Sequence, residues 1–262
     1  MTEAKKFNLG IFDIFVKFAG SDKKYHKIWV EPERIVLSIP KQRNIMYTPE
    51  TPLFTEEFGI NDIVKFSSML SLFSDVSIKL ELPNLIMSEK NGTRLMTYRT
   101  GKRIAFEGND DSTNIILRNK KVATALDVSR HMEEEGQYFG MHLDAETIAK
   151  LKKASSILAS GTTEESVIRF EKMSDDDTIN VVVKNATTDN IFVETLTGQN
   201  HVKMGAFSAC FNANYLLDGN WDVKVYPKED YDYNGTKVPR SFFRMEDKTR
   251  NLSMSIVYKK EI

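Results

Sequence analysis

One pattern occurs in both halves of this 262-residue sequence and constrains its fold more than any other feature. An amphipathic helical segment leads directly into strand segments in which apolar and polar residues alternate. In the first half the helical segment covers residues 61–73, and the strand begins at residue 76. In the second half the segment covers residues 211–217, breaks at Asp218-Gly219-Asn220 and leads into a strand at residue 221. The repeat favours two domains of similar architecture over one large core.

The composition limits the classes of protein that fit the sequence. At 41% hydrophobic residues, the chain has enough apolar side chains for two modest cores. Its formal net charge of −1 argues against a nucleic-acid-binding protein that is held by overall basicity, but not against one whose cations lie on a single surface. Cys210 is the only cysteine, which excludes an intramolecular disulfide and favours a reducing compartment such as the cytoplasm. No segment is apolar for long enough to span a bilayer, so we expect no membrane partner.

The order of elements follows from periodicity and capping signals. Helices are predicted over residues 8–19, 61–73 and 144–160, the last with Asp144 as its N-cap and Gly161 after its end. Strands are predicted at 27–30, 34–39, 76–82, 85–88, 94–98, 103–106, 167–172, 179–184, 191–196 and 207–211, followed by three closing strands that end at 252–258. Mixed charge and few aromatic residues over 107–140 indicate a connection. We therefore expect an N-terminal domain over 1–112, an interdomain connection over 113–140 and a C-terminal domain over 141–262.

Lysines lie on the polar edges of the predicted helices, opposite their apolar sides. On the helix over 144–160, Ile148, Leu151, Ser155 and Leu158 line one side, while lysines and small residues line the other. Cations on helices, with no catalytic cluster nearby, indicate a surface that contacts a polyanion and performs no chemistry on it. We therefore expect a DNA-handling scaffold that is not an enzyme and needs no cofactor. The candidate DNA-binding residues are Lys6, Lys17, Lys65, Lys150, Lys152 and Lys153.

Other polar and aromatic groups have simpler explanations than a catalytic or metal site. The run Asp175-Asp176-Asp177 suits a hairpin turn better than a nuclease metal site, and His131 and His142 lack the spacing of a zinc site. Cys210 stands in an apolar run, which predicts a buried structural thiol. The aromatic residues Trp29, Trp221, Phe242 and Phe243 either stack on bases, as in single-strand-binding proteins, or belong to the core.

Three stretches of the sequence resemble DNA polymerase sliding clamps, most of all the processivity clamps of tailed phages and more distantly proliferating cell nuclear antigen. The first stretch is residues 60–73, Ile-Asn-Asp-Ile-Val-Lys-Phe-Ser-Ser-Met-Leu-Ser-Leu-Phe. The second is the helix over 144–160 followed by Val167-Ile168-Arg169-Phe170, and the third is residues 207–225. The resemblance implies an α+β DNA-clamp fold, with two similar domains that each pack two helices on antiparallel sheets. It also implies a homotrimeric ring whose helices line a central hole.

The same resemblance implies the function and the partners. A sliding clamp encircles duplex DNA and tethers the replicative DNA polymerase, and a clamp loader opens the ring. A phage-encoded clamp would work in the host cytoplasm. Clients of such clamps dock through a short peptide in an apolar pocket near the interdomain connection. The candidate partner-binding residues are Ile115, Ile116, Leu117, Val122 and Leu126. The alternative function is that of a single-stranded DNA-binding or recombination-associated phage protein, and a metal-dependent nuclease ranks last.

Overall fold

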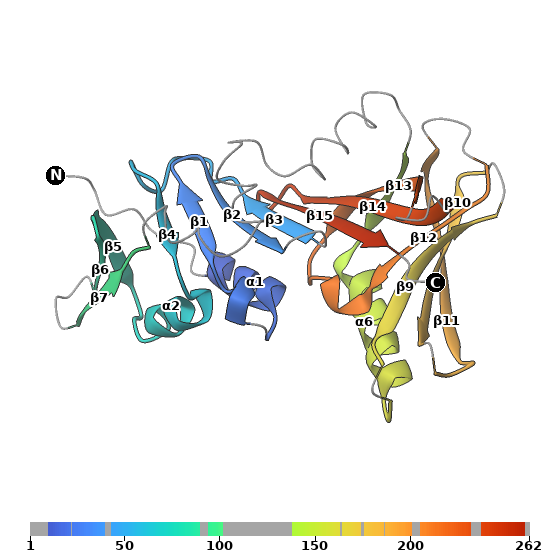
Figure 1. Cartoon of the computed structure of the whole chain (residues 1–262), viewed down its shortest axis with the longest axis horizontal. Helices are drawn as coiled ribbons and strands as arrows, with labels where there is room; N and C mark the ends of the chain where they lie inside the picture. Colours follow the sequence, from blue (N-terminus) through green and yellow to red (C-terminus); the bar gives the residue numbers. More distant parts are fainter. Residues whose placement is uncertain are drawn as a thin grey trace. The chain divides into compact units, whose positions relative to one another are not determined.

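The chain divides into two compact units, which the ribbon of Figure 1 shows coloured along the sequence. Unit 1 is Met1–Lys120 with Arg250–Leu252, and unit 2 is Lys121–Thr249 with Ser253–Ile262. The computed structural model describes residues 10–21, 23–39, 43–89, 94–101, 138–162, 164–173, 176–185, 187–200, 205–231 and 237–259. Within these ranges, no helix is long and apolar enough to cross a membrane.

In the described part of unit 1, two helices pack against antiparallel strands. Its elements are α1 (Gly10–Ala19), the 3-10 turn η1 (Lys23–Tyr25), β1 (Ile28–Glu31), β2 (Arg34–Ile39), β3 (Arg43–Tyr47), β4 (Phe58–Ile60), α2 (Ile63–Leu70), β5 (Val76–Glu81), β6 (Asn84–Glu89) and β7 (Leu95–Arg99). The strands lie in the orders β4-β1-β2-β3 and β5-β6-β7. The predicted hairpin after β6 is confirmed by the β6–β7 register. The sequence did not predict β3 and β4, and the strand predicted at 103–106 lies outside the described residues.

The described part of unit 2 contains one α-helix, eight strands and a 3-10 turn. Its elements are β8 (Phe139–Leu143), α6 (Ala145–Ala159), β9 (Ser166–Lys172), β10 (Thr178–Asn185), β11 (Ile191–Asn200), β12 (Phe207–Asn212), the 3-10 turn η2 (Ala213–Tyr215), β13 (Trp221–Tyr231), β14 (Lys237–Asp247) and β15 (Leu252–Lys259). The strand order is β12-β9-β10-β11-β8-β13-β14-β15. β8 was not predicted, because its residues fall at the end of the polar connection.

A single order of elements underlies both units. Unit 2 reads strand, helical segment and three strands, twice: β8-α6-β9-β10-β11 and then β12-η2-β13-β14-β15. Unit 1 repeats it as α1-β1-β2-β3 and β4-α2-β5-β6-β7, and the strand position before α1 falls outside the described residues. The predicted order of helix, strands, helix and strands is present in unit 1, whereas in unit 2 the 3-10 turn η2 takes the place of the second helix.

The helix predicted over 211–217 is wrong in its extent. Phe211 still belongs to β12, where it pairs with Ile168, and only three residues form the 3-10 turn η2. The chain then buries Leu217, whose carbonyl accepts a hydrogen bond from the Trp221 indole at 3.1 Å. Because β12 and this anchored loop take up the residues on both sides, no room is left for an α-helical turn. The sequence of this second helical segment, residues 211–217, contains no lysine.

Aromatic side chains form the core of unit 2. The Phe243 ring lies 5.3 Å from that of Phe170 and 4.8 Å from that of Phe211, measured between ring centroids. Trp221 is fully buried, as Trp29 nearly is in unit 1. Phe242 is also buried. These rings cannot stack on bases without unfolding the sheets, so the observation that motivated single-strand binding is explained by packing instead.

Candidate nucleic-acid interface

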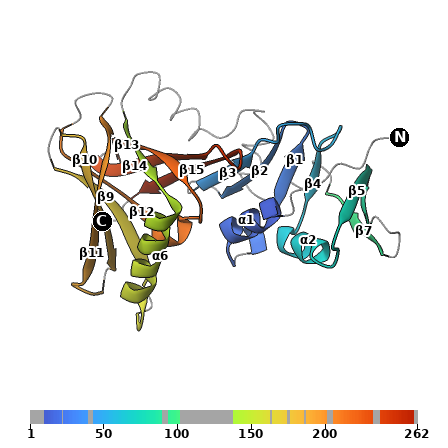
Figure 2. The ribbon, with the colours of Figure 1, turned by 180° about the vertical axis from the view of Figure 1, so that it is seen from behind.

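The two helices α1 and α2 of unit 1 lie side by side, as Figures 1 and 2 show from opposite sides. On the buried side, the rings of Phe12 and Phe66 meet edge to face with their centroids 5.1 Å apart. On the exposed side, the Ser67 hydroxyl donates a hydrogen bond of 2.8 Å to the Asp13 carboxylate. Lys17 on α1 and Lys65 on α2 are both exposed. The structure therefore places these two predicted DNA-binding lysines on neighbouring helices.

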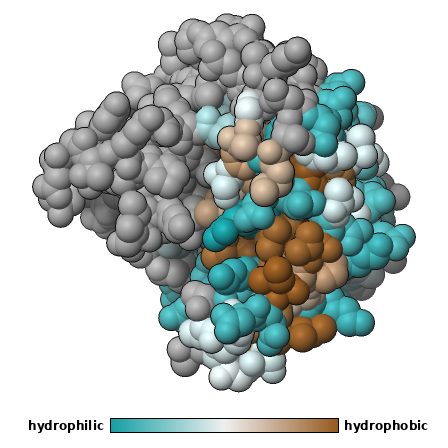
Figure 3. Space-filling view, turned by 90° about the vertical axis from the view of Figure 1, so that its right-hand side faces the viewer, coloured by the Kyte–Doolittle hydropathy of each residue, from teal (hydrophilic) through white to brown (hydrophobic). Residues whose placement is uncertain are grey.

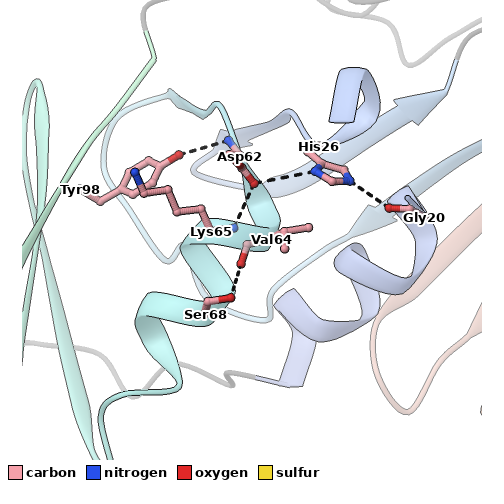
Figure 4. Close-up of polar contacts among 7 residues, drawn as sticks. All are labelled: Gly20, His26, Asp62, Val64, Lys65, Ser68 and Tyr98. Atoms are coloured by element: carbon pink, nitrogen blue, oxygen red, sulfur yellow. Dashed lines mark hydrogen bonds and ion pairs between the residues drawn. The ribbon is translucent and has the colours of Figure 1, made fainter. Parts of the chain in front are cut away.

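A polar network sets the position of α2 relative to α1 (Figure 4). Asp62 is the N-cap of α2, and its side chain accepts a hydrogen bond of 3.0 Å from the backbone N–H of Lys65. The buried imidazole of His26 donates from Nε2 to the carbonyl of Gly20, just after α1, at 2.9 Å. Its Nδ1 lies 3.8 Å from Asp62. His26 therefore links the end of α1 to the start of α2, which fixes the two helices that carry the lysines.

Tyr98 of β7 anchors the same cap from the other side. The backbone N–H of Asp62 donates a hydrogen bond of 3.2 Å to the Tyr98 hydroxyl. Burial raises the pKa of that hydroxyl above its ordinary value, and the Asp62 charge adds to the effect. Tyr98 therefore stays neutral and holds the α2 cap at every physiological pH.

Helix α6 carries the polar face of unit 2. The Asp144 side chain caps it by accepting a hydrogen bond of 2.7 Å from the Thr147 N–H, as predicted, and this bond lowers the pKa of Asp144. The buried stripe consists of Thr147, Ile148, Leu151 and Ala154. The predicted apolar side is therefore confirmed for Ile148 and Leu151, whereas Ser155 and Leu158 are only half-buried. The opposite ridge, Ala145, Ala149, Lys153, Ser156 and Ser160, is exposed.

The lysines of α6 differ in their surroundings. The Lys150 ammonium lies 3.1 Å from the Glu146 carboxylate and 3.9 Å from that of Glu194 on β11, and the hydrogen bond that it donates to Glu146 raises the pKa of Lys150. Lys152 forms an ion pair with Asp218, in the loop between η2 and β13. For Lys153, no ion pair is found among the described residues. Of the three α6 lysines, only Lys153 can therefore contact a ligand without first breaking an ion pair with a described carboxylate.

Some predicted site residues cannot be placed. Lys6 and the partner-binding candidates Ile115, Ile116, Leu117, Val122 and Leu126 lie outside the described residues, as do Asp175 and His131. The five remaining lysines are distributed between the units, with Lys17 and Lys65 in unit 1 and Lys150, Lys152 and Lys153 in unit 2. They stay predictions as DNA contacts.

The other candidate groups have structural roles. The Asp176 carboxylate accepts hydrogen bonds from the backbone N–H and the hydroxyl of Thr178, as expected of a turn. His142 pairs with Asp222 at 2.9 Å. Within the described ranges, no group of three or more His, Cys, Asp or Glu residues has the arrangement of a metal site. Cys210 is half-buried, not buried as predicted, because it lies on the outward face of β12 opposite Arg169.

Sequence reasoning missed two features of unit 2. The first is Lys172, which is buried, donates to the Asp176 carbonyl and lies 5.4 Å from the centre of the Phe139 ring. Strand alternation gives a signal for its burial, because Lys172 shares a face with Ile168 and Phe170. The second is the set of carboxylates that pair with the α6 lysines. Asp218 is 66 residues from Lys152 in the sequence, so no local pattern reveals it.

Comparisons with known proteins bear on the fold. No family model and no curated protein matches the sequence. Among solved structures, the chain is similar to a putative DNA polymerase III beta subunit from Eubacterium rectale, with a TM-score of 0.59 and 12% identity over 97% of this chain and 63% of that one. It is also similar to the DNA polymerase sliding clamp of Pseudomonas aeruginosa, with a TM-score of 0.57 and 11% identity over 98% of this chain and 66% of that one. The chain thus spans a little under two thirds of the length of either protein.

A weaker likeness, with a TM-score of 0.47 and 9% identity, is to the DNA polymerase accessory subunit of Kaposi's sarcoma-associated herpesvirus, over 97% of this chain and 96% of that one. The two stronger likenesses, together with the duplicated order of elements, establish that the chain has the sliding-clamp fold. The predicted α+β clamp architecture is confirmed.

Proposed function

We propose that the chain is a sliding-clamp subunit that performs no catalysis, and that three copies close into a ring around duplex DNA. The observation that carries the proposal is the presence of exposed lysines on the helices of both units of a clamp fold. Each chain supplies two units of like architecture, so three chains would supply six. The ring would tether a replicative DNA polymerase. Because the sequence resembles the processivity clamps of tailed phages, we propose a phage origin.

Lysine suits contacts that must be exchanged easily. An ammonium group attracts a phosphate without the planar two-point geometry of arginine, so one phosphate readily replaces the next. All the candidate DNA contacts are lysines: Lys6, Lys17, Lys65, Lys150, Lys152 and Lys153. Retention on DNA would come from encirclement, which is compatible with a chain of net charge −1.

A strand edge in unit 2 supports ring closure. Residues Ile191 to Thr197 of β11 pair with β10 on one side, whereas β8 pairs with β11 only from Gly198 onwards. Beside this edge, Ile191 and Val193 are 56% and 45% exposed, and Figure 3 shows apolar side chains gathered on this side of unit 2. Open edges of this kind invite pairing with another strand. In the ring, an edge strand of the next subunit's unit 1 would cover it, and β7, whose Leu95 is 69% exposed, offers such a strand.

The remaining partners follow from the proposed ring. A closed ring needs a clamp loader, because it cannot thread onto circular DNA by itself. The polymerase would dock through a short peptide near the connection over 113–140, at Ile115, Ile116, Leu117, Val122 and Leu126.

The subunit count and the topology of DNA binding test the proposal. Native mass spectrometry should show a particle of about 90 kDa, three times the 30.0 kDa subunit. Val193→Asp should shift the population towards single subunits, whereas Met173→Asp, at a 75% exposed position after β9, should not. Protein loaded on a nicked circle should remain through a high-salt wash and be lost when the circle is linearised. A protein that is monomeric at micromolar concentration and leaves circles and linear DNA equally fast would refute the proposal.

A further inference from the structure

Asp218 is held in place before any ligand arrives. It stands in the loop between η2 and β13, where Leu216 and Leu217 are buried. The Trp221 indole donates to the Leu217 carbonyl, and the Asn220 side chain accepts a hydrogen bond of 2.8 Å from the N–H of Ala145 at the start of α6. The loop is thus tied to the helix, and the Asp218 carboxylate contacts the ammonium group of Lys152 from a fixed position.

Lys150 is held by two carboxylates from different elements. Glu146 lies one turn before it on α6, the order in which a glutamate and a lysine pair best on a helix. Glu194 approaches from β11 at 3.9 Å and is only 30% exposed. Both lysines therefore have a carboxylate as their partner in the free protein, and Lys153 on the same helix does not.

Pairing with a carboxylate changes how much a lysine–phosphate contact contributes to DNA affinity and to its salt dependence. When an unpaired lysine contacts DNA, a cation condensed on the DNA is released, so affinity falls steeply as salt rises. A paired lysine must break its ion pair before it contacts a phosphate, which offsets much of what that contact would gain. While it stays with its carboxylate it releases no cation from the DNA, so it adds little affinity and little salt dependence.

We infer that three carboxylates limit the affinity for DNA. Asp218 weakens the contact of Lys152 with DNA, and Glu146 and Glu194 together weaken that of Lys150. The inference rests on the proposed function and adds to it a regulation of the same face. A ring that slides needs weak contacts, and these carboxylates weaken two of the three contacts that α6 can offer without removing the positive charge.

The salt dependence of DNA binding measures this effect directly. Fluorescence anisotropy with a short linear duplex, at several salt concentrations, gives the slope of log affinity against log salt. Asp218→Asn should steepen that slope by about 0.9, the value for one added phosphate contact, and tighten binding about two- to fivefold at low salt. The double variant Glu146→Gln with Glu194→Gln should have an effect of the same kind through Lys150.

A control variant separates release of a lysine from loss of a negative charge. Glu165→Gln removes one charge from a carboxylate that accepts hydrogen bonds from the Asn212 and Asn214 side chains and forms no ion pair among the described residues. Its slope should match the wild type. Adding Lys152→Ala to Asp218→Asn should return the slope to the wild-type value, because the gain depends on that one ammonium group.

The outcomes distinguish the inference from the function on which it rests. If Lys153→Ala weakens binding but Asp218→Asn leaves the slope unchanged, or changes it no more than Glu165→Gln does, the inference is wrong and the DNA-binding face stands. If Lys153→Ala also has no effect on binding or slope, both the face and the inference are wrong.

Discussion

Gly198→Ala should destabilise unit 2 severely, because the added methyl group has no space. Gly198 lies on β11 where that strand begins to pair with β8. A Cβ placed there would overlap the backbone oxygen of Gly140 and lie 2.5 Å from the Phe139 ring. Carbon atoms that pack well are about 3.5 to 4.0 Å apart, so the ring would have to retreat by about 1 Å.

The surroundings prevent that retreat. Phe139 is fully buried, the Lys172 ammonium lies 5.4 Å from its centre, and the Phe207 ring lies 6.3 Å away. The Gly140 oxygen belongs to the backbone and cannot move without shifting β8. Overpacking a rigid core costs up to about 3 kcal/mol when side chains can adjust, and a clash with backbone stands at the upper end of that range.

The two tryptophans allow the effect to be assigned to one unit. Trp29 is buried in unit 1 and Trp221 in unit 2, and the chain has no others. Fluorescence of a Trp29→Phe background therefore follows unit 2 alone during urea unfolding. Gly198→Ala should lower the free energy of unfolding of unit 2 by about 3 kcal/mol, which corresponds to a fall in Tm of roughly 10 °C.

Gly205→Ala is the matched control, because nothing lies within 4 Å of the Cβ position at Gly205. It should change the free energy of unfolding by less than about 0.5 kcal/mol. If Gly198→Ala is as stable as Gly205→Ala, the close approach of β11 to β8 is not present in the folded protein.

Two further predictions concern unit 2. The buried Asn185 side chain donates to the Thr162 hydroxyl at 3.2 Å and to the Glu164 carbonyl at 2.9 Å, so Asn185→Ala leaves buried groups unpaired and should cost about 2 kcal/mol in urea unfolding. Asn180→Ala, which removes only one exposed contact with Thr195, should cost less than about 0.5 kcal/mol, and equal costs would contradict the argument. Hydrogen bonds from His142 and Lys248 hold the pKa of Asp222 below its ordinary value of 3.8. The stability that this group contributes is therefore present above pH 4 and is lost as the pH falls through its lower folded pKa, so urea midpoints of the wild type and Asp222→Asn should converge below that pH. A difference that stays constant from pH 6 to pH 2.5 would show that the carboxylate is not stabilised by these contacts.

The sequence predicted those elements whose signals are local. The Asp144 cap, the helix behind it and the hairpin after β6 each depend on residues within a few positions of one another, and all three are present. The prediction of a helix over 211–217 was wrong, because the apolar spacing of this segment fits a strand end followed by a buried turn as well as it fits a helix. β8 was not predicted, because its apolar residues follow a long polar stretch whose composition indicates a connection.

The candidate site shows the same division between local and distant information. Periodicity placed Lys17, Lys65 and Lys153 correctly on exposed faces, because helix amphipathicity is a property of one segment. It could not show that Glu194 and Asp218 approach Lys150 and Lys152, since those contacts form only when β11 and the loop after η2 close on α6. A helical wheel treats the three lysines of α6 as equal, whereas the folded unit distinguishes them.

Among the described residues of unit 2, α6 is the one helical segment that carries lysines, because the second repeat has only the 3-10 turn η2. In unit 1 both repeats contribute a helix, and each helix carries an exposed lysine. In unit 2, η2 spans three residues, and the Asn212 and Asn214 side chains beside it donate to Glu165, so this segment offers hydrogen-bond donors but no positive charge. On the proposed function, and because Lys150 and Lys152 are paired with carboxylates, the contribution of α6 to DNA binding would depend chiefly on Lys153. Removing that one ammonium group should therefore reduce DNA binding more than removing either of its two neighbours on α6.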